Sequence, residues 1–143
     1  MAYLSHNPKE LPINFKKLNY EIMRLLNFSS MTGERTWLKR LDHIIEKHLA
    51  DASLNNERLA SEIAISERHL FRRVREITGL SPQKYLRRYR LQRAMQYLIN
   101  GKYRKVKEVA FAVGYINTSY FISQFEKEYG KKPLRVLQEA GWR

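Results

Sequence analysis

The sequence predicts an all-α fold of about seven helices, in which two helix-turn-helix units are joined by a long linker helix. Apolar residues recur at helical spacing throughout, and no segment shows sustained period-two alternation. One sequence unit also occurs twice, as residues 59–85 and 109–136. Finally, Gly and Pro stand where the proposed helices end and begin, as they do in helical proteins.

The two copies match at an offset of 50 before the turn and 51 after it, so one residue is inserted between two helices, where an insertion costs least. The matched positions are Ala60 with Ala110, Ile63 with Val113, Ala64 with Gly114, Leu70 with Phe121, Val74 with Phe125, Gly79 with Gly130 and Pro82 with Pro133. A helix-turn-helix mainly serves to place its second helix in the DNA major groove. Two copies in one chain indicate a protein that reads a long site.

Residues 1–36 differ from the rest and are predicted to be a tail or an interdomain linker. Pro8 and Pro12 favour an extended start, and residues 15–28 carry apolar side chains at the spacing of a short amphipathic helix. The polar and small residues that break this helix are Ser29, Ser30, Thr32 and Gly33. The segment could dock on the domain, pair two chains or be the remnant of an upstream domain; we favour the remnant or linker interpretation.

The first helix-turn-helix is expected over about 37–80. Its first helix, 37–51, has one apolar face formed by Trp37, Leu41, Ile44, Ile45 and His48. Asn55 can cap a second helix at 56–64, with Leu59, Ala60 and Ile63 turned inward. Ser66 can cap the third helix, 67–78, and Gly79 ends it.

The linker helix is expected over about 82–100, because Pro82 suits a first helical turn and Asn100-Gly101 favours an end. Its apolar stripe is Leu91, Ala94, Met95 and Leu98. The second helix-turn-helix follows at about 105–139, with helices near 105–113 and 118–129 and a turn at 114–117. Gly130 ends the second of these helices, and Pro133 opens a last short one.

The charge of the chain favours a polyanionic partner. The formal net charge is +13, and residues 66–107 hold thirteen Lys and Arg against two Glu. Such a one-sided surface is typical of nucleic-acid binding. The absence of cysteine excludes disulfides and thiolate metal sites. No apolar run approaches the roughly 20 residues that span a bilayer, and the N-terminus lacks a signal-peptide core. The default expectation is therefore a cytoplasmic protein without a membrane segment.

The helix at 67–78 has the side chains of a major-groove reader. Leu70, Val74 and Ile77 share the face that must enter the core. The opposite face carries Arg68, Arg72 and Arg75, with Phe71 on one flank. Arginine can bond guanine O6 and N7 together, which is worth about 1–3 kcal/mol of discrimination. We expect the two N-terminal arginines to reach bases and the third to meet phosphate; the alternative is that all three only hold phosphates or face water.

The helix at 118–129 presents a different surface. Phe121 and Phe125 face inward, and the outer face carries no basic residue. It holds Ser119, Ser123 and Glu126, with Thr118 and Ile122 on the edges. Hydroxyls can bond several base edges or phosphate, and an isoleucine can contact a thymine methyl. We expect this helix to add less affinity and specificity, or else not to enter the groove at all.

The linker length suits two readers on one DNA face. About 18 helical residues span about 27 Å, whereas one turn of B-DNA advances about 34 Å. The two recognition helices are therefore expected in successive major-groove segments. The linker arginines at positions 87, 88, 90 and 93 point in several directions, so only a subset can reach phosphate.

Residues 37–137 resemble the C-terminal DNA-binding domain of the AraC/XylS transcription regulators. The second copy carries most of the resemblance, through Val106, Ala110, Gly114-Tyr115, Ser119-Tyr120-Phe121, Phe125, Lys127, Gly130 and Pro133. The first copy and linker agree at Leu59-Ala60, Ser66, Leu70, Arg72, Gly79, Pro82, Tyr85, Arg90-Leu91, Ala94 and Leu98. Ile116 departs from the family, which often has a polar residue there, and this puts phosphate contacts of the second turn in doubt.

The resemblance implies two homeodomain-like subdomains that bind double-stranded promoter DNA and usually activate transcription, with RNA polymerase as a partner. Positions that match base-reading residues of the family are Arg68, Phe71, Arg72, Thr118, Ser119, Ile122 and Ser123. The expected phosphate contacts are Ser66, Arg73, Arg75, Arg87, Lys105, Asn117 and Lys127. No cofactor, metal or small-molecule ligand is expected within this chain, and the protein is expected at the bacterial nucleoid.

Members of this family usually carry a further sensory or dimerisation domain, and some are output domains of two-component proteins. Residues 1–36 are too few for a sensory domain. The chain is therefore expected to be a compact regulator or a C-terminal fragment of a larger one. A dimer could form through a missing or N-terminal segment.

Three other classes of protein fit the sequence less well. An enzyme is not expected, because His43, Glu46 and His48 lack the spacing of a helical zinc site and no other catalytic motif occurs. A non-specific chromatin protein would need only charge, whereas here charge faces away from a core stripe. A partner-binding helical module would show an exposed apolar patch.

Overall fold

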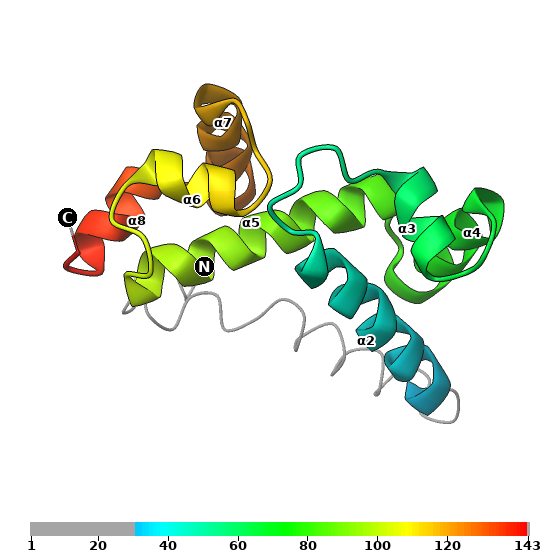
Figure 1. Cartoon of the computed structure of the whole chain (residues 1–143). Coiled ribbons are helices and arrows are strands. Elements are labelled where there is room, and N and C mark those ends of the chain that lie inside the picture. Colours follow the sequence, from blue (N-terminus) through cyan, green and yellow to red (C-terminus); the bar gives the residue numbers. More distant parts are fainter. Residues whose placement is uncertain (1–30, 143) are drawn as a thin grey trace. The chain divides into compact units, whose positions relative to one another are not determined.

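The computed structural model describes residues 31–142, and every regular element in that range is an α-helix (Figure 1). The seven helices are α2 (Met31–Lys47), α3 (Asn56–Glu62), α4 (Glu67–Thr78), α5 (Pro82–Asn100), α6 (Val106–Ala112), α7 (Thr118–Tyr129) and α8 (Pro133–Glu139). The predicted all-α fold with two helix-turn-helix units is confirmed. The amphipathic helix predicted at 15–28 lies outside the described residues.

The described chain divides into two compact units. The N-terminal unit comprises residues 31–49 and 53–88, and thus holds α2, α3, α4 and the start of α5. The C-terminal unit comprises residues 50–52 and 89–142, and holds the rest of α5 with α6, α7 and α8. The helix α5 continues from one unit into the other, as predicted for a linker helix. The assignment of residues 1–36 to a separate tail stays a prediction.

The helix α2 begins and ends earlier than the predicted 37–51. It starts at Met31, so Gly33 lies inside the helix instead of breaking it. One glycine costs only about 1 kcal/mol in a helix, and Glu34 in the first turn favours the start by its charge. The buried face is also rotated from the predicted one. Its residues are Leu38, Leu41, Ile45 and Leu49, whereas Trp37 and Ile44 are half-buried.

A buried polar contact joins α2 to the start of α5. Asp42 is 6% exposed and accepts a hydrogen bond of 2.6 Å from the Tyr85 hydroxyl. A carboxylate loses much hydration when buried, so it requires a partner of this kind. This bond fixes the register of α2 against α5 within the N-terminal unit.

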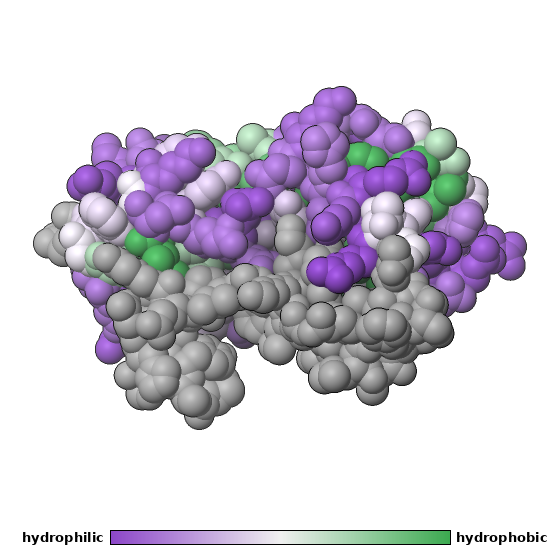
Figure 2. Space-filling model, turned by 90° about the horizontal axis from the view of Figure 1, so that it is seen from below, coloured by the Kyte–Doolittle hydropathy of each residue, from purple (hydrophilic) through white to green (hydrophobic). Residues whose placement is uncertain are grey.

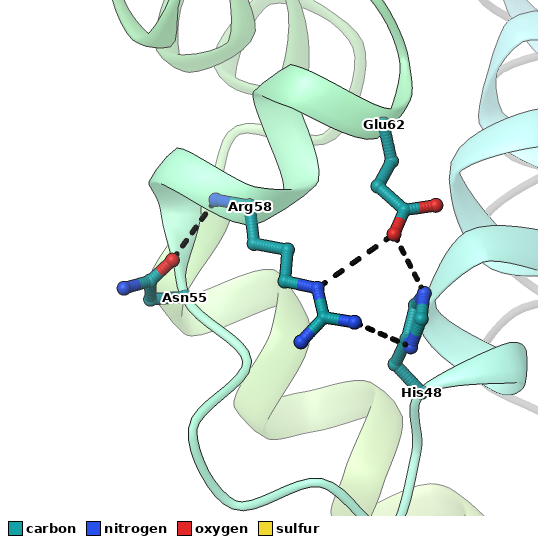
Figure 3. A network of polar contacts seen from close by, with 4 residues as sticks. All are labelled: His48, Asn55, Arg58 and Glu62. Atoms are coloured by element: carbon teal, nitrogen blue, oxygen red, sulfur yellow. Dashed lines mark hydrogen bonds and ion pairs between the residues drawn. The ribbon is translucent and has the colours of Figure 1, made fainter.

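A small cluster of polar side chains joins the end of α2 to α3 (Figure 3). His48 Nε2 lies 2.8 Å from a Glu62 carboxylate oxygen, and Arg58 Nε lies 3.7 Å from the same oxygen. The backbone N–H of Arg58 donates to Asn55 Oδ1 at 2.9 Å, which confirms the predicted cap of α3. His48 thus belongs to a structural contact and not to the apolar face predicted for it.

The turns of the two helix-turn-helix units share one backbone pattern. Ala64 has a left-handed φ of 65°, and its counterpart Gly114 has 92°. After each of these residues a backbone N–H donates five residues back, from Ile65 to Ala60 at 3.0 Å and from Tyr115 to Ala110 at 2.9 Å. Since Ser66 and Asn117 are the N-caps that follow, the inserted residue of the second copy is Ile116.

Trp142 forms hydrogen bonds and ring contacts within the C-terminal unit. Its indole Nε1 donates to the Ile99 carbonyl at 2.7 Å, and its backbone N–H donates to Leu137 at 3.1 Å. The ring covers Gly101, where a Cβ atom would lie 2.6 Å from two ring carbons. The Arg104 guanidinium lies 5.1 Å from the ring centre. Trp142 therefore joins the ends of α5 and α8 to the loop that enters α6.

Replacing Gly101 with alanine should lower stability more than the same change at Gly130. Both glycines are left-handed, with φ of 72° and 76°, so both variants carry a strain of about 1–2 kcal/mol. At Gly130 a Cβ atom meets nothing within 4 Å. At Gly101 it also displaces Trp142, for a further cost of about 1–3 kcal/mol. Urea unfolding of the two variants measures this difference. Equal losses of unfolding free energy would contradict the stabilising contact between Trp142 and Gly101.

Candidate nucleic-acid interface

The helix α4 is held by its buried face and by a cap at each end. Leu70 and Val74 are fully buried and Ile77 is 6% exposed, as predicted. Ser66 Oγ accepts a 3.0 Å bond from the backbone N–H of His69. At the other end the Gly79 N–H donates to the Arg75 carbonyl at 2.8 Å, with the glycine in the left-handed conformation. These contacts fix which residues of α4 face solvent.

The outer face of α4 offers three cations and one aromatic ring. Arg68, Arg72 and Arg75 are exposed, and Phe71 is 46% exposed. Within residues 31–142, none of the three guanidinium groups forms a hydrogen bond or ion pair. Guanidinium groups that no carboxylate neutralises remain available to an anion or to a guanine edge.

Arg73 differs from its neighbours on α4. It is half-buried, and its guanidinium lies 5.2 Å from the centre of the Trp37 ring. Its Nε is buried and has no hydrogen-bond partner among the described residues. This contact links α4 to α2 by a cation–π interaction. Sequence spacing could not reveal it, because the two residues are far apart in the chain.

The helix α7 is built like α4 but presents hydroxyls. Phe121 and Phe125 are fully buried, and Asn117 Oδ1 caps the helix by accepting from the Tyr120 N–H at 2.8 Å. Ser119 and Ser123 are exposed. Thr118 and Ile122 are half-buried at the edges, and Glu126 is exposed. The faces derived from helical periodicity therefore agree with the structure.

Two exposed apolar residues beside α7 were not among the predicted site residues. Ile116 is 81% exposed in the turn, and Tyr120 is 53% exposed in the first turn of the helix. The Tyr120 ring lies 6.1 Å from the largely buried ring of Tyr115. The signal for Ile116 was its place as the extra residue of the second copy, because an inserted residue has no counterpart in the shared core.

The remaining residues expected to contact phosphate are all exposed. Arg87 lies on α5, Lys105 precedes α6 and Lys127 lies in the last turn of α7. Ser66 and Asn117 use a side-chain oxygen as a helix cap, which leaves their hydroxyl and amide hydrogens as donors. Their role toward DNA stays a prediction.

Some arginines of the linker helix pack and form hydrogen bonds within the protein, and others face solvent. Arg90 is 9% exposed and donates to the Asp51 carbonyl at 2.7 Å. Burial lowers the pKa of Arg90, and the nearby Tyr115 and Asp51 partly oppose that shift. Arg93 donates to Gln96 at 2.6 Å, whereas Arg87 is exposed. Only a subset of these cations therefore faces solvent.

The face of the molecule in Figure 2 is mostly hydrophilic where it is coloured, with small apolar areas between. In the described part of the chain, no three His, Cys, Asp or Glu side chains gather as a metal site would require. No helix among residues 31–142 combines the length and apolar character needed to cross a bilayer.

Comparison with known proteins gives a match to a family described as "Helix-turn-helix domain" over residues 59–139. The HTH-type transcriptional activator RhaS of Escherichia fergusonii is 33% identical over 120 residues, covering 82% of this chain and 42% of the relative. The chain thus spans less than half the length of that curated relative.

Two solved structures resemble the described fold. The DNA-binding domain of AdpA, a global transcriptional factor solved with a target DNA, matches with a TM-score of 0.63 and 27% identity, over 74% of this chain and 92% of that one. The C-terminal domain of AraT, a response regulator from Geobacillus stearothermophilus, matches with a TM-score of 0.64 and 26% identity, over 71% and 84%.

The contacts of α4 predict unequal effects of two arginine substitutions on stability. Arg72→Ala should change the free energy of unfolding by less than about 0.5 kcal/mol, because surface residues without partners contribute little. Arg73→Ala should lower it by about 0.5–2 kcal/mol through the lost Trp37 contact. Thermal unfolding of both variants checks this, and an unchanged midpoint for Arg73→Ala would contradict the packing role.

Proposed function

This chain belongs to the AraC/XylS family of DNA-binding transcription regulators, and from that premise we propose that it reads a double-stranded site through two unequal contacts. The helix α4 supplies most of the sequence discrimination, and α7 mainly extends the footprint. The observation that carries this proposal is the difference between the two outer faces. Exposed arginines without protein partners lie on α4, whereas hydroxyls and a glutamate lie on α7.

On α4, Arg68 and Arg72 are the proposed base readers. They lie in the first half of the helix, and N-terminal residues of a recognition helix reach base edges. Each can donate two hydrogen bonds to guanine O6 and N7. Phe71 lies between them in the sequence and is proposed to contact a thymine methyl or the edge of a base.

On α7, Thr118, Ser119, Ile122 and Ser123 are the proposed contacts. A hydroxyl bonds several base edges with little discrimination, so this helix contributes less to sequence choice than α4. The continuous α5 helix is proposed to keep the two readers in successive major-groove segments.

Phosphate contacts are proposed for exposed groups around both helices: Ser66, Arg75, Arg87, Lys105, Asn117 and Lys127. Arg73 was expected among them, and we propose that its half-buried guanidinium acts mainly through Trp37. Lysine and arginine contacts to phosphate release counterions, so affinity falls steeply with salt.

The wider role of the protein is also proposed. The chain acts in the bacterial cytoplasm at the nucleoid, without catalysis, as the output part of a larger regulator or two-component protein. It activates transcription and contacts RNA polymerase. RhaS is named as an activator, which supports activation, and AraT is named as a response regulator, which supports the two-component role. A dimer could form through a segment outside the described residues.

Arg68→Ala and Arg72→Ala should each weaken binding to a selected cognate duplex about tenfold or more, with a much smaller loss on random duplex. Lys39→Ala on α2 is the matched control, because it removes an exposed cation outside the proposed interface. Fluorescence anisotropy at fixed salt measures both affinities. An equal loss on cognate and random duplex would leave only phosphate contact for these arginines.

A further inference from the structure

A hollow of about 380 Å³ lies in the C-terminal unit where α7 ends and α8 begins. Its walls include three cations, Lys131, Lys132 and Arg135, and one apolar side chain, Leu134. Leu134 is 51% exposed, one of the few large apolar residues on the described surface. Both helices belong to one compact unit, so the hollow is defined within it.

Two of the three cations are held in place by Glu139. Lys131 Nζ donates to one carboxylate oxygen of Glu139 at 2.6 Å, and Arg135 Nε donates to the other at 3.0 Å. These two bonds lower the pKa of Glu139, chiefly through Lys131. Lys132 forms no ion pair within residues 31–142. Among the described residues, the three cations face only the carboxylates of Glu139 and Glu126, so this surface keeps a net positive charge.

The first copy of the repeat shows that this surface is not required by the scaffold. At the positions of Lys132 and Leu134 it has Ser81 and Gln83, also between a left-handed glycine and a helix that starts with proline. The backbone therefore folds in the same way with neutral polar residues there. The second copy carries a cation and an exposed leucine that the shared core does not use.

The exposed Leu134 among these cations indicates the kind of ligand. Glu126 also lines the hollow, and its carboxylate repels phosphates and carboxylates alike, so it does not discriminate between them. A phosphate gains nothing from contact with an exposed leucine, whereas an apolar side chain of another protein can pack on it. Cations around an apolar centre complement a protein segment that carries both carboxylates and an apolar residue.

We propose that this hollow binds an acidic segment of a partner protein. An apolar side chain of that segment packs on Leu134, and its carboxylates pair with Lys132 and with the rim formed by Lys131 and Arg135. The surface meets the outer face of α7 only at Glu126, and the proposed base contacts Thr118, Ser119, Ile122 and Ser123 do not line it.

The test uses the full chain and a displayed library of short random peptides. Selection on the wild-type protein should enrich peptides that combine Asp or Glu with a large apolar residue. The double substitution Lys132→Ser and Leu134→Gln installs the residues of the first copy, so the fold is expected to persist; circular dichroism and thermal unfolding verify this. Affinity of the selected peptides for this variant should fall about tenfold or more.

Lys47→Ala on α2 is the matched control, because it removes an exposed cation from the other unit, and peptide binding should be unchanged. The affinity of the double variant for duplex DNA should remain within about twofold of wild type. The proposal is overturned if the enriched peptides lack acidic residues or bind the double variant equally well. It is also overturned if DNA affinity falls as far as peptide affinity, since the surface would then be a phosphate contact.

Discussion

Burial of one face of each recognition helix is the constraint on which the rest of the structure depends. Leu70 and Val74 in α4, and Phe121 and Phe125 in α7, are completely removed from solvent. Burying a side chain of this size contributes about 1.5–3 kcal/mol, far more than any one exposed contact. Because helical geometry ties the outer face to the inner one, this burial decides which residues can meet DNA.

The same constraint explains how two copies of one unit come to differ in function. The copies keep the buried positions, the left-handed turn at Ala64 and Gly114, and the glycines that end α4 and α7. Surface positions are free of these requirements, so arginines occupy one outer face and hydroxyls the other. A similar divergence places a leucine and a lysine beside α8, where the first copy has neutral polar residues.

Sequence reasoning located the elements whose limits are set by nearby residues. The bounds predicted for α4 and α7 agree with the structure, because caps such as Ser66 and Gly130 act within one helical turn. The start of α2 was predicted too late, since local breakers such as Gly33 are outweighed by the helix around them. Contacts between distant residues, such as Arg73 with Trp37 and Trp142 with Gly101, could not be predicted because no periodicity encodes them. The outer faces of the candidate site were predicted correctly, whereas the DNA contacts of individual residues stay predictions.

The central claim is that two readers of one scaffold contribute unequally to recognition. Selection of bound sequences from random duplex DNA by the wild-type chain tests it most directly. Two unequal readers predict a site about two helical turns long, roughly 20 base pairs, with one strongly specified half that contains guanine and one weakly specified half. Two equally specified halves, or a specified half that depends on α7 and not on Arg68 and Arg72, would contradict it.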